Sequence, residues 1–99
     1  MFVVLVEFRL YSEFGDFFRE RVMRQAADSL ALEAECHQFD VCIDPNQPDD
    51  LLLYEIYSDR AAFDTHLASA HFVQFDADVK HCIEQKTVRT FERLESVNR

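Results

Sequence analysis

The alternation of apolar and polar residues along the chain predicts four β-strands. Residues 2–10 are apolar on both faces at first and then alternate, which is typical of a strand buried on both sides where it begins. Residues 36–44 alternate strictly, and residues 51–57 resume the extended pattern after a polar break. Residues 85–94 end the chain as an alternating, β-branched segment. Most of the chain between these segments has helical spacing.

The helical pattern begins at Phe14, where apolar residues start to recur every three or four positions, and Ser12 is a candidate N-cap. This predicts a helix of about twenty residues whose inward stripe is Phe14, Phe17, Phe18, Val22, Ala26 and Leu30. A second helical region is broken in two. Asp59 or Ser58 can cap a short helix through His66, and Ser69 can cap the next. The apolar positions of that last helix are Phe72, Phe75, Val79 and Ile83.

The order of the elements predicts the fold class. Residues 44–50 hold both prolines and are expected to form the loop of a β-hairpin. The resulting order, β-α-β-β-α-β, is the ferredoxin-like unit of the α+β class, in which helices cover one face of a four-stranded antiparallel sheet. Residues 1–99 then form a single domain. Because several residues of the other sheet face are apolar, we expect a second subunit to cover it as a homodimer.

Composition narrows the class of partner. A net charge of −9 argues against binding to nucleic acid or to an anionic membrane, because both need Lys and Arg. The first residues have no basic segment of a signal peptide, and no apolar run reaches the ~18 residues that a membrane span needs. Three cysteines without a C-x-x-C pair favour reduced thiols. These features predict a soluble cytoplasmic protein.

Potential chemistry is concentrated in residues 53–72. Glu55 stands in the middle of an apolar strand and shares a face with Tyr57. A buried carboxylate either has a raised pKa, and so serves as an acid or base, or forms a structural ion pair. Arg89 and Arg93 are the candidate partners for such a pair.

Two histidines accompany Glu55. His66 falls on or beside the inward stripe of its helix, where it is either a hydrogen-bonded core residue or a donor or acceptor for a ligand. His71 falls in the first turn of the next helix, whose partial positive charge favours neutral imidazole. His71 can therefore act as a general base, or it can help to close the turn between the helices.

Other kinds of site have weaker support. The spacing of the histidines matches no zinc signature, even with Glu55 as a third ligand, so no metal is expected. Cys36 and Cys42 are too far apart along an extended strand to form a disulfide. A single glycine in the whole chain rules out a glycine-rich phosphate loop.

The combined pattern resembles the antibiotic biosynthesis monooxygenase (ABM) family over nearly the whole chain, from Phe2 to about Leu94. The resemblance rests on residues 36–41, Asp44-Pro45, residues 53–57, Ala62-Phe63 with His66, and Ser69-x-His71-Phe72. It is closest to the branch of small quinol monooxygenases and autoinducer-2-degrading isomerases. Members of this family are dimeric α+β barrels, and their monooxygenases oxidise phenols or quinols with molecular oxygen without metal or flavin.

The resemblance implies a site and a function. His66 or His71 would be the base that forms a phenolate, with Glu55 as its partner, and no cofactor is expected. The residues expected to bind a small aromatic or quinol-like substrate are Tyr57, Phe39, Phe63 and Phe72. Some family members use an Asn and a Trp in the pocket. This chain has no Trp, and its asparagines are Asn46 and Asn98, so that mechanism does not transfer.

Two alternatives to a cofactor-independent monooxygenase remain. The first is an isomerase of a small phosphorylated dicarbonyl compound, which needs a phosphate site, and the basic candidates for that site are Arg21, Arg89 and Arg93. The second is a non-catalytic dimeric binding domain in which Glu55 and the histidines are structural. A shared fold does not decide among these functions.

Overall fold

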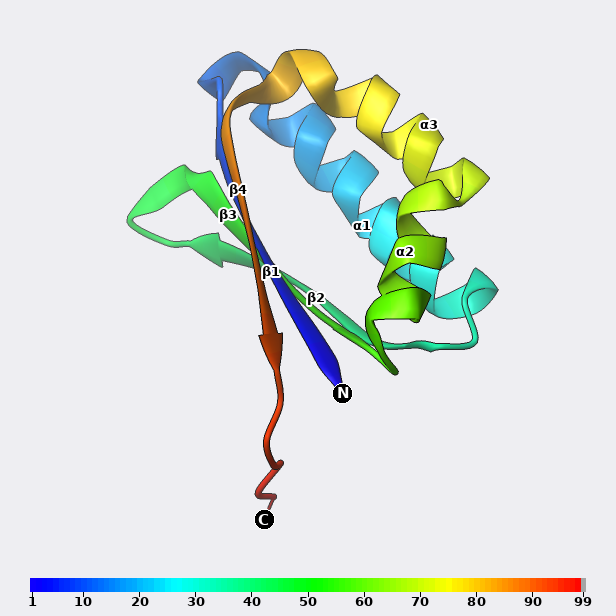
Figure 1. The fold of residues 1–99 in the computed structure, drawn as a ribbon. Coiled ribbons are helices and arrows are strands. Elements are labelled where there is room, and N and C mark those ends of the chain that lie inside the picture. The colour runs from blue at the N-terminus through cyan, green and yellow to red at the C-terminus, as the bar shows by residue number, and fades with distance from the viewer. Residues whose placement is uncertain (99) are drawn as a thin grey trace.

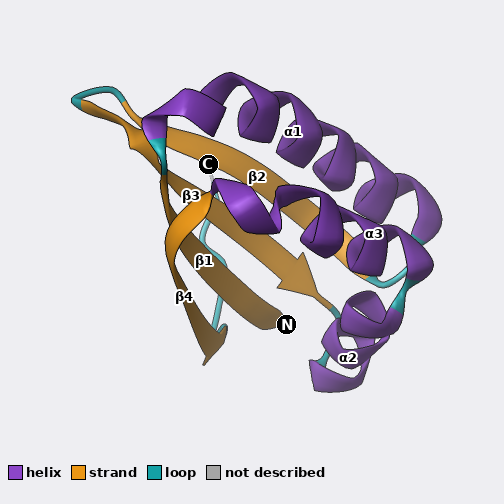
Figure 2. Cartoon of the chain, turned by 90° about the horizontal axis from the view of Figure 1, so that it is seen from above, coloured by secondary structure: helices purple, strands orange, loops and turns teal. Residues whose placement is uncertain are grey.

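A computed structural model describes residues 1–98 and confirms the predicted β-α-β-β-α-β order (Figure 1). The elements are β1 (Phe2–Leu10), a 3₁₀ turn (Ser12–Phe14), α1 (Gly15–Leu32), β2 (Cys36–Asp44), β3 (Gln47–Tyr57), α2 (Arg60–Ala68), α3 (Ala70–Val79), a second 3₁₀ turn (Lys80–Cys82) and β4 (Ile83–Glu92). The strands form one antiparallel sheet in the order β2-β3-β1-β4. All three helices lie on the same face of this sheet (Figure 2). Residues 93–98 form neither helix nor strand, and Arg99 lies outside the described residues.

The core lies between the sheet and α1 and α3. Val4 and Phe8 of β1 point toward the helices, where Phe18 and Val22 of α1 are fully buried. The rings of Phe8 and Phe18 meet edge to face with their centroids 5.0 Å apart. Burying each such side chain contributes roughly 1.5–3 kcal/mol, so this layer supplies much of the stability of the domain.

The inward face of α1 differs from the predicted stripe. Phe17 and Leu30 are about half exposed, although the spacing placed them inward. The buried positions instead include three polar residues, Arg21, Gln25 and Ser29. The helix is thus rotated so that polar side chains, and not only apolar ones, enter the interior.

Two of the three predicted helix caps are confirmed. The Asp59 carboxylate accepts from the backbone N–H of Ala62 (2.8 Å), and the Ser69 hydroxyl accepts from that of Phe72 (3.3 Å). The break between α2 and α3 therefore has a local cause. Ser12 does not cap α1: it lies in the 3₁₀ turn and its hydroxyl contacts Asp49 instead (2.5 Å).

The hairpin and the ends of two strands also differ from expectation. Residues 44–50 are not a loop, because β3 begins at Gln47 and only residues 45–46 separate it from β2. An irregularity between Cys36 and Gln38 shifts the alternation at the start of β2. Strict alternation would place Cys36 on the other sheet face from Phe39, but the shift makes Cys36 pair with Tyr57 and buries it in the core with Phe39. Ile83 begins β4 and does not continue the helix.

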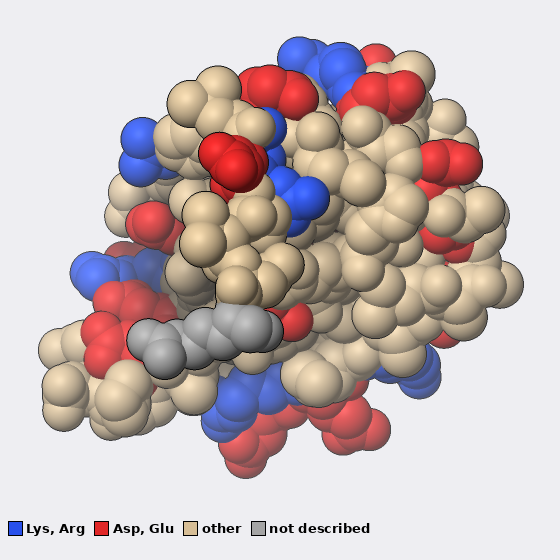
Figure 3. All heavy atoms as spheres, turned by 90° about the horizontal axis from the view of Figure 1, so that it is seen from below, with Lys and Arg blue, Asp and Glu red and all other residues tan. Residues whose placement is uncertain are grey.

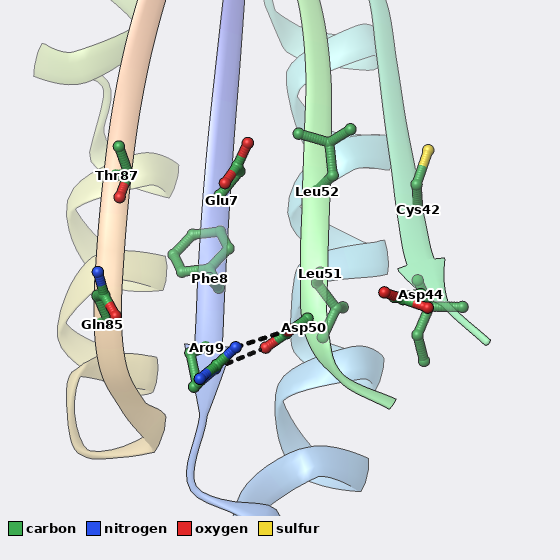
Figure 4. A pocket seen from close by; sticks show the side chains of 11 residues that line it. Glu7, Phe8, Arg9, Cys42, Asp44, Asp50, Leu51, Leu52, Gln85 and Thr87 are labelled. Carbon is green, nitrogen blue, oxygen red and sulfur yellow. Dashed lines mark hydrogen bonds and ion pairs between the residues drawn. The ribbon is translucent and has the colours of Figure 1, made fainter. Parts of the chain in front are cut away.

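The sheet face away from the helices carries mixed side chains. Leu5, Leu52 and Tyr54 are half-buried there, and a hollow of about 480 Å³ lies beside the lower ends of the strands (Figure 4). Within it, Arg9 and Asp50 form a two-bond ion pair at 2.8 and 3.0 Å. Such solvent-exposed pairs contribute little to stability, because water screens the two charges.

Charge is distributed without a large basic area on the end of the molecule seen in Figure 3, where acidic and basic side chains alternate with uncharged surface. This agrees with the net charge of −9. Within residues 1–98, none of the helices combines the length and the apolar character that crossing a membrane requires.

Candidate active site

Glu55 is a buried acid in the centre of β3. It lies between Val4 of β1 and Phe39 of β2, on the face covered by the helices, and is 2% exposed. The hydroxyl of Tyr57, two residues further along the same face, donates to Oε1 of Glu55 (2.5 Å). The partner of the Glu55 carboxyl group is therefore Tyr57, and not Arg89 or Arg93.

Burial controls how readily Glu55 ionises. Removing the carboxylate from water raises the pKa of Glu55 to about 7, against the hydrogen bond from Tyr57, which lowers it. The neighbouring Glu33 raises it further and Lys86 opposes it. Burial, and the proximity of Glu55, raise the pKa of Tyr57 as well, so this phenol remains a donor at neutral pH.

His66 lies in the last turn of α2, where it is 2% exposed. Its Nδ1 is 2.9 Å from Oε2 of Glu33, and its Nε2 is 4.0 Å from Oε1 of Glu55. An ionised carboxylate only accepts hydrogen bonds, so the contact with Glu33 places a proton on Nδ1 and leaves Nε2 as an acceptor. Burial lowers the pKa of His66 against the influence of Glu33, which favours the neutral form of the ring.

His71 approaches the same Glu33 carboxylate from the start of α3. Its Nε2 is 2.8 Å from Oε2 of Glu33, although this contact lacks hydrogen-bond geometry and is best described as electrostatic. Its Nδ1 is 3.1 Å from Nε2 of Gln25. Glu33, the C-cap residue that follows α1, thus stands between two imidazoles.

The contacts form one continuous polar chain through an apolar interior. In order, its members are Tyr57, Glu55, His66, Glu33, His71 and Gln25. The two histidines and the glutamate predicted as catalytic residues are therefore brought together. The arrangement can accept a proton at Nε2 of His66 and stabilise the resulting charge with Glu33, as paired carboxylates do for histidine bases.

A small cavity of about 40 Å³ lies against this chain. Predicted site residues that line it are Glu55, His66, Phe39, Phe63 and Phe72; other lining residues include Gln25, Leu67, Lys86 and Val88. The other two predicted site residues, Tyr57 and His71, do not line the cavity. Each contacts a residue that does: Tyr57 bonds Glu55, and His71 contacts Gln25. Leu67 and Val88 are 40% and 48% exposed, so the cavity borders the surface between α2 and β4. An aromatic ring needs about 150 Å³, so a ring can enter only if side chains move.

Glu33 and Gln25 belong to the site although neither was predicted from the sequence. Gln25 had a detectable signal, because it shares an i, i+3, i+4, i+7 face with Val22, Ala26 and Ser29 and interrupts an apolar stripe. Glu33 had none, since a carboxylate at a helix end usually faces solvent.

The basic residues proposed for a phosphate site lie elsewhere. Arg21 is buried in an ion pair with Asp78 (2.9 Å). Arg89 lies over the ring of Phe91, on the sheet face away from the helices. None of Arg21, Arg89 and Arg93 lines the cavity. Within residues 1–98, no group of three or more His, Cys, Asp and Glu side chains is arranged to hold a metal ion.

Fold and site together define a small ferredoxin-like protein with a buried acid–imidazole network. A family model for antibiotic biosynthesis monooxygenase matches residues 1–78, about four-fifths of the sequence. The chain belongs to the ABM family.

Solved structures resemble the chain closely in fold. A Nitrosomonas europaea protein assigned to the same family has a TM-score of 0.91 at 21% identity, covering 96% of this chain and 100% of that one. A Deinococcus radiodurans protein with the same assignment has a TM-score of 0.89 at 23% identity, covering 99% and 97%. A Mycobacterium tuberculosis protein has a TM-score of 0.88 at 20% identity, covering 98% of each chain. A search of curated proteins found no match to the sequence. At these identities the likeness to solved structures concerns the fold.

Proposed function

We propose that the protein is a monooxygenase that oxidises a small quinol or phenol with molecular oxygen, without metal or flavin. Membership of the ABM family supports a general monooxygenase-like function. The observation that carries the finer proposal is the orientation of His66. Its Nδ1 is held by Glu33, and its Nε2 is directed toward Glu55 beside an aromatic-lined cavity.

The first step is proton removal from a substrate hydroxyl. Nε2 of His66 accepts the proton, and Glu33 stabilises the imidazolium that forms. The 4.0 Å between Nε2 and Oε1 of Glu55 is too long for a direct hydrogen bond. A substrate hydroxyl placed beside both atoms would contact a base and a carboxyl group whose pKa is about 7.

The phenolate is then the reductant. Deprotonation makes the ring electron-rich, so that it can pass electrons to oxygen inside a cavity lined by Phe39, Phe63 and Phe72. For a hydroquinone, one oxygen atom enters the ring and the other leaves as water, so that C₆H₆O₂ and O₂ give C₆H₄O₃ and H₂O. The substrate supplies all four electrons, and the balance requires no other reductant.

The cavity must widen for this to occur. Leu67 and Lys86 border it near the surface, where Leu67 is 40% exposed and Lys86 is also exposed. Movement of these two side chains and of Phe72 would enlarge it without disturbing the sheet. We propose that substrate enters here, between α2 and β4.

A homodimer is part of the proposal. Leu52 and Tyr54 lie on the helix-free sheet face and are only half-buried, which favours their burial against a second copy. The free cysteines Cys36, Cys42 and Cys82 agree with a reducing compartment, and we propose the cytoplasm.

Oxygen uptake with a panel of hydroquinones tests the function. His66→Gln is expected to lower kcat by about 10²-fold or more, because it removes the base. His37→Gln is the matched control, since His37 is exposed and bonds Ser58 away from the cavity. Glu33→Gln should shift the pH profile as well as the rate, because it removes the charge that favours protonated His66.

Uptake at the rate of the uncatalysed reaction, or uptake that His66→Gln leaves unchanged, would leave the non-catalytic domain as the better interpretation. The isomerase alternative has less support. Lys86 is the one Lys or Arg among the described cavity-lining residues, and binding a phosphate group would require more than one such cation.

A further inference from the structure

Gln25 is a buried polar side chain whose hydrogen bonds are incomplete. It is 1% exposed and lies between Val22 and Ala26 on the inward face of α1. Its Nε2 contacts Nδ1 of His71 (3.1 Å) and Oγ of Ser29 (3.4 Å). Its Oε1 has no partner, and the residue lines the cavity. A buried acceptor without a donor destabilises the folded protein, so its retention here calls for an explanation.

The neighbouring contacts explain why the oxygen, and not the nitrogen, is left free. His71 faces the Glu33 carboxylate through Nε2 at 2.8 Å, which favours a proton on that nitrogen. In the tautomer that carries its proton on Nε2, Nδ1 of His71 is an acceptor, and it requires the N–H of Gln25. The reversed amide would require His71 to be protonated on both nitrogens. The amide oxygen is thus the group left to accept a hydrogen bond from a ligand once the cavity has widened.

Polar side chains from four elements line the cavity: Glu55 of β3, His66 of α2, Gln25 of α1 and Lys86 of β4. Most of the other lining residues are apolar, among them Phe39, Phe63 and Phe72. A flat ring with two hydroxyls would satisfy Gln25 with one of them while the other contacts Glu55 and His66.

We infer that Gln25 is a specificity-determining residue: its carboxamide oxygen accepts a hydrogen bond from a second hydroxyl of the substrate, so that the site selects dihydroxylated rings over monophenols. This inference rests on the proposed function for the choice of an aromatic substrate. The chemistry of Gln25 itself, a fixed acceptor in an apolar cavity, is independent of any reaction with oxygen.

Binding measured by calorimetry without oxygen tests the inference. Three probes share a phenol ring: hydroquinone carries a donor at the far position, 4-methylphenol an apolar group of similar size, and 4-methoxyphenol only an acceptor. The protein should bind hydroquinone about tenfold or more tightly than either of the others, because only hydroquinone satisfies Oε1. This comparison uses the unaltered protein, so it decides the question whether or not a variant folds.

The Gln25→Met variant identifies the residue responsible. Met has a similar volume and no acceptor of comparable strength, so the preference for hydroquinone over 4-methylphenol should fall at least tenfold. Gln47→Met, at the exposed start of β3, should leave it unchanged. Binding of none of the probes, equal binding of 4-methylphenol or 4-methoxyphenol, or a preference that survives in Gln25→Met would overturn the inference. A preference without oxygen uptake would instead overturn the monooxygenase function and leave the role of Gln25 intact.

Discussion

Replacing Glu55 with Gln should make the protein more stable at pH 8 and change its stability little at pH 4. Glu55 is 2% exposed, and burial raises the pKa of its carboxyl group to about 7. The unfolded chain returns this group to its ordinary pKa of 4.5. Gln has nearly the same shape and can still accept the hydrogen bond from Tyr57, but it never ionises.

The sign and the size follow from these two pKa values. Below pH 4.5 the group is protonated in both states, so ionisation contributes no difference. Between pH 4.5 and 7 the unfolded state ionises while the folded state keeps its proton, so the free energy of unfolding falls as the pH rises. At about 1.4 kcal/mol for each tenfold change in the dissociation constant, a rise from 4.5 to about 7 corresponds to about 3 kcal/mol. Above pH 7 the loss is complete.

Urea unfolding followed by far-UV circular dichroism, at five values from pH 4 to pH 8, measures the effect. Protein concentration is held constant, because assembly would make stability depend on it. The variant Glu20→Gln removes an exposed carboxyl group on α1 and serves as the control. Contributions from the other titrating groups, His66 included, are common to the compared proteins to first order and largely cancel.

Parallel curves for the unaltered protein and Glu55→Gln across this range would refute the reasoning. They would mean that the Glu55 carboxyl ionises as readily in the folded protein as in the unfolded chain. A carboxyl ¹³C titration of Glu55 by NMR would then show a midpoint near pH 4.5 and would locate the error in the effect assigned to burial.

The other two predictions concern the helix-free sheet face and the thiols. Leu52→Lys should shift the protein toward monomer in sedimentation at micromolar concentration, because it places a charge on the half-buried apolar surface. The control Leu32→Lys, at the 68% exposed end of α1, should not change the assembly state. Equal sedimentation of the two variants would contradict a dimer through this face. Cys36 should resist a thiol reagent at pH 8, because it is 6% exposed and burial raises its pKa to about 11. Cys42 is exposed and pairs with Leu52, so it should be labelled more quickly in Leu52→Lys than in the unaltered protein. Rapid native labelling at Cys36, detected by mass spectrometry, would contradict the packing at the start of β2.

Much of the fold was predictable because its determinants are local. Alternation defined the strands, and Asp59 and Ser69 marked helix starts that the structure confirms. The failures have local causes too. The register shift between Cys36 and Gln38 turns the Cys36 side chain to the other face of the sheet, and an alternating sequence pattern does not show where such a shift occurs. Pro48 suggested a loop, yet it lies at the start of β3, beyond the last residue of β3 that pairs with β1, where a missing N–H is tolerated.

The candidate site was predictable only in part. Glu55 and His66 could be predicted as site residues because each is an ionisable residue in an apolar pattern. In the structure Nε2 of His66 lies 4.0 Å from Oε1 of Glu55. Their common partner Glu33 comes from 22 residues before Glu55, at the end of another element. Its role depends on where α1 ends relative to α2 and α3, and that is a property of the packed helices.

Glu33 also limits what the two histidines can do together. It is a single carboxylate, with Oε2 at 2.9 Å from Nδ1 of His66 and 2.8 Å from Nε2 of His71. One protonated imidazole beside it gives a neutral pair, whereas two would leave a net positive charge in an interior where charge is costly. The presence of His71 also lowers the pKa of His66. We therefore propose that the two rings and Glu33 together accept one proton. In the proposed reaction this proton comes from one hydroxyl of a quinol, and the second hydroxyl stays protonated and able to donate to Gln25.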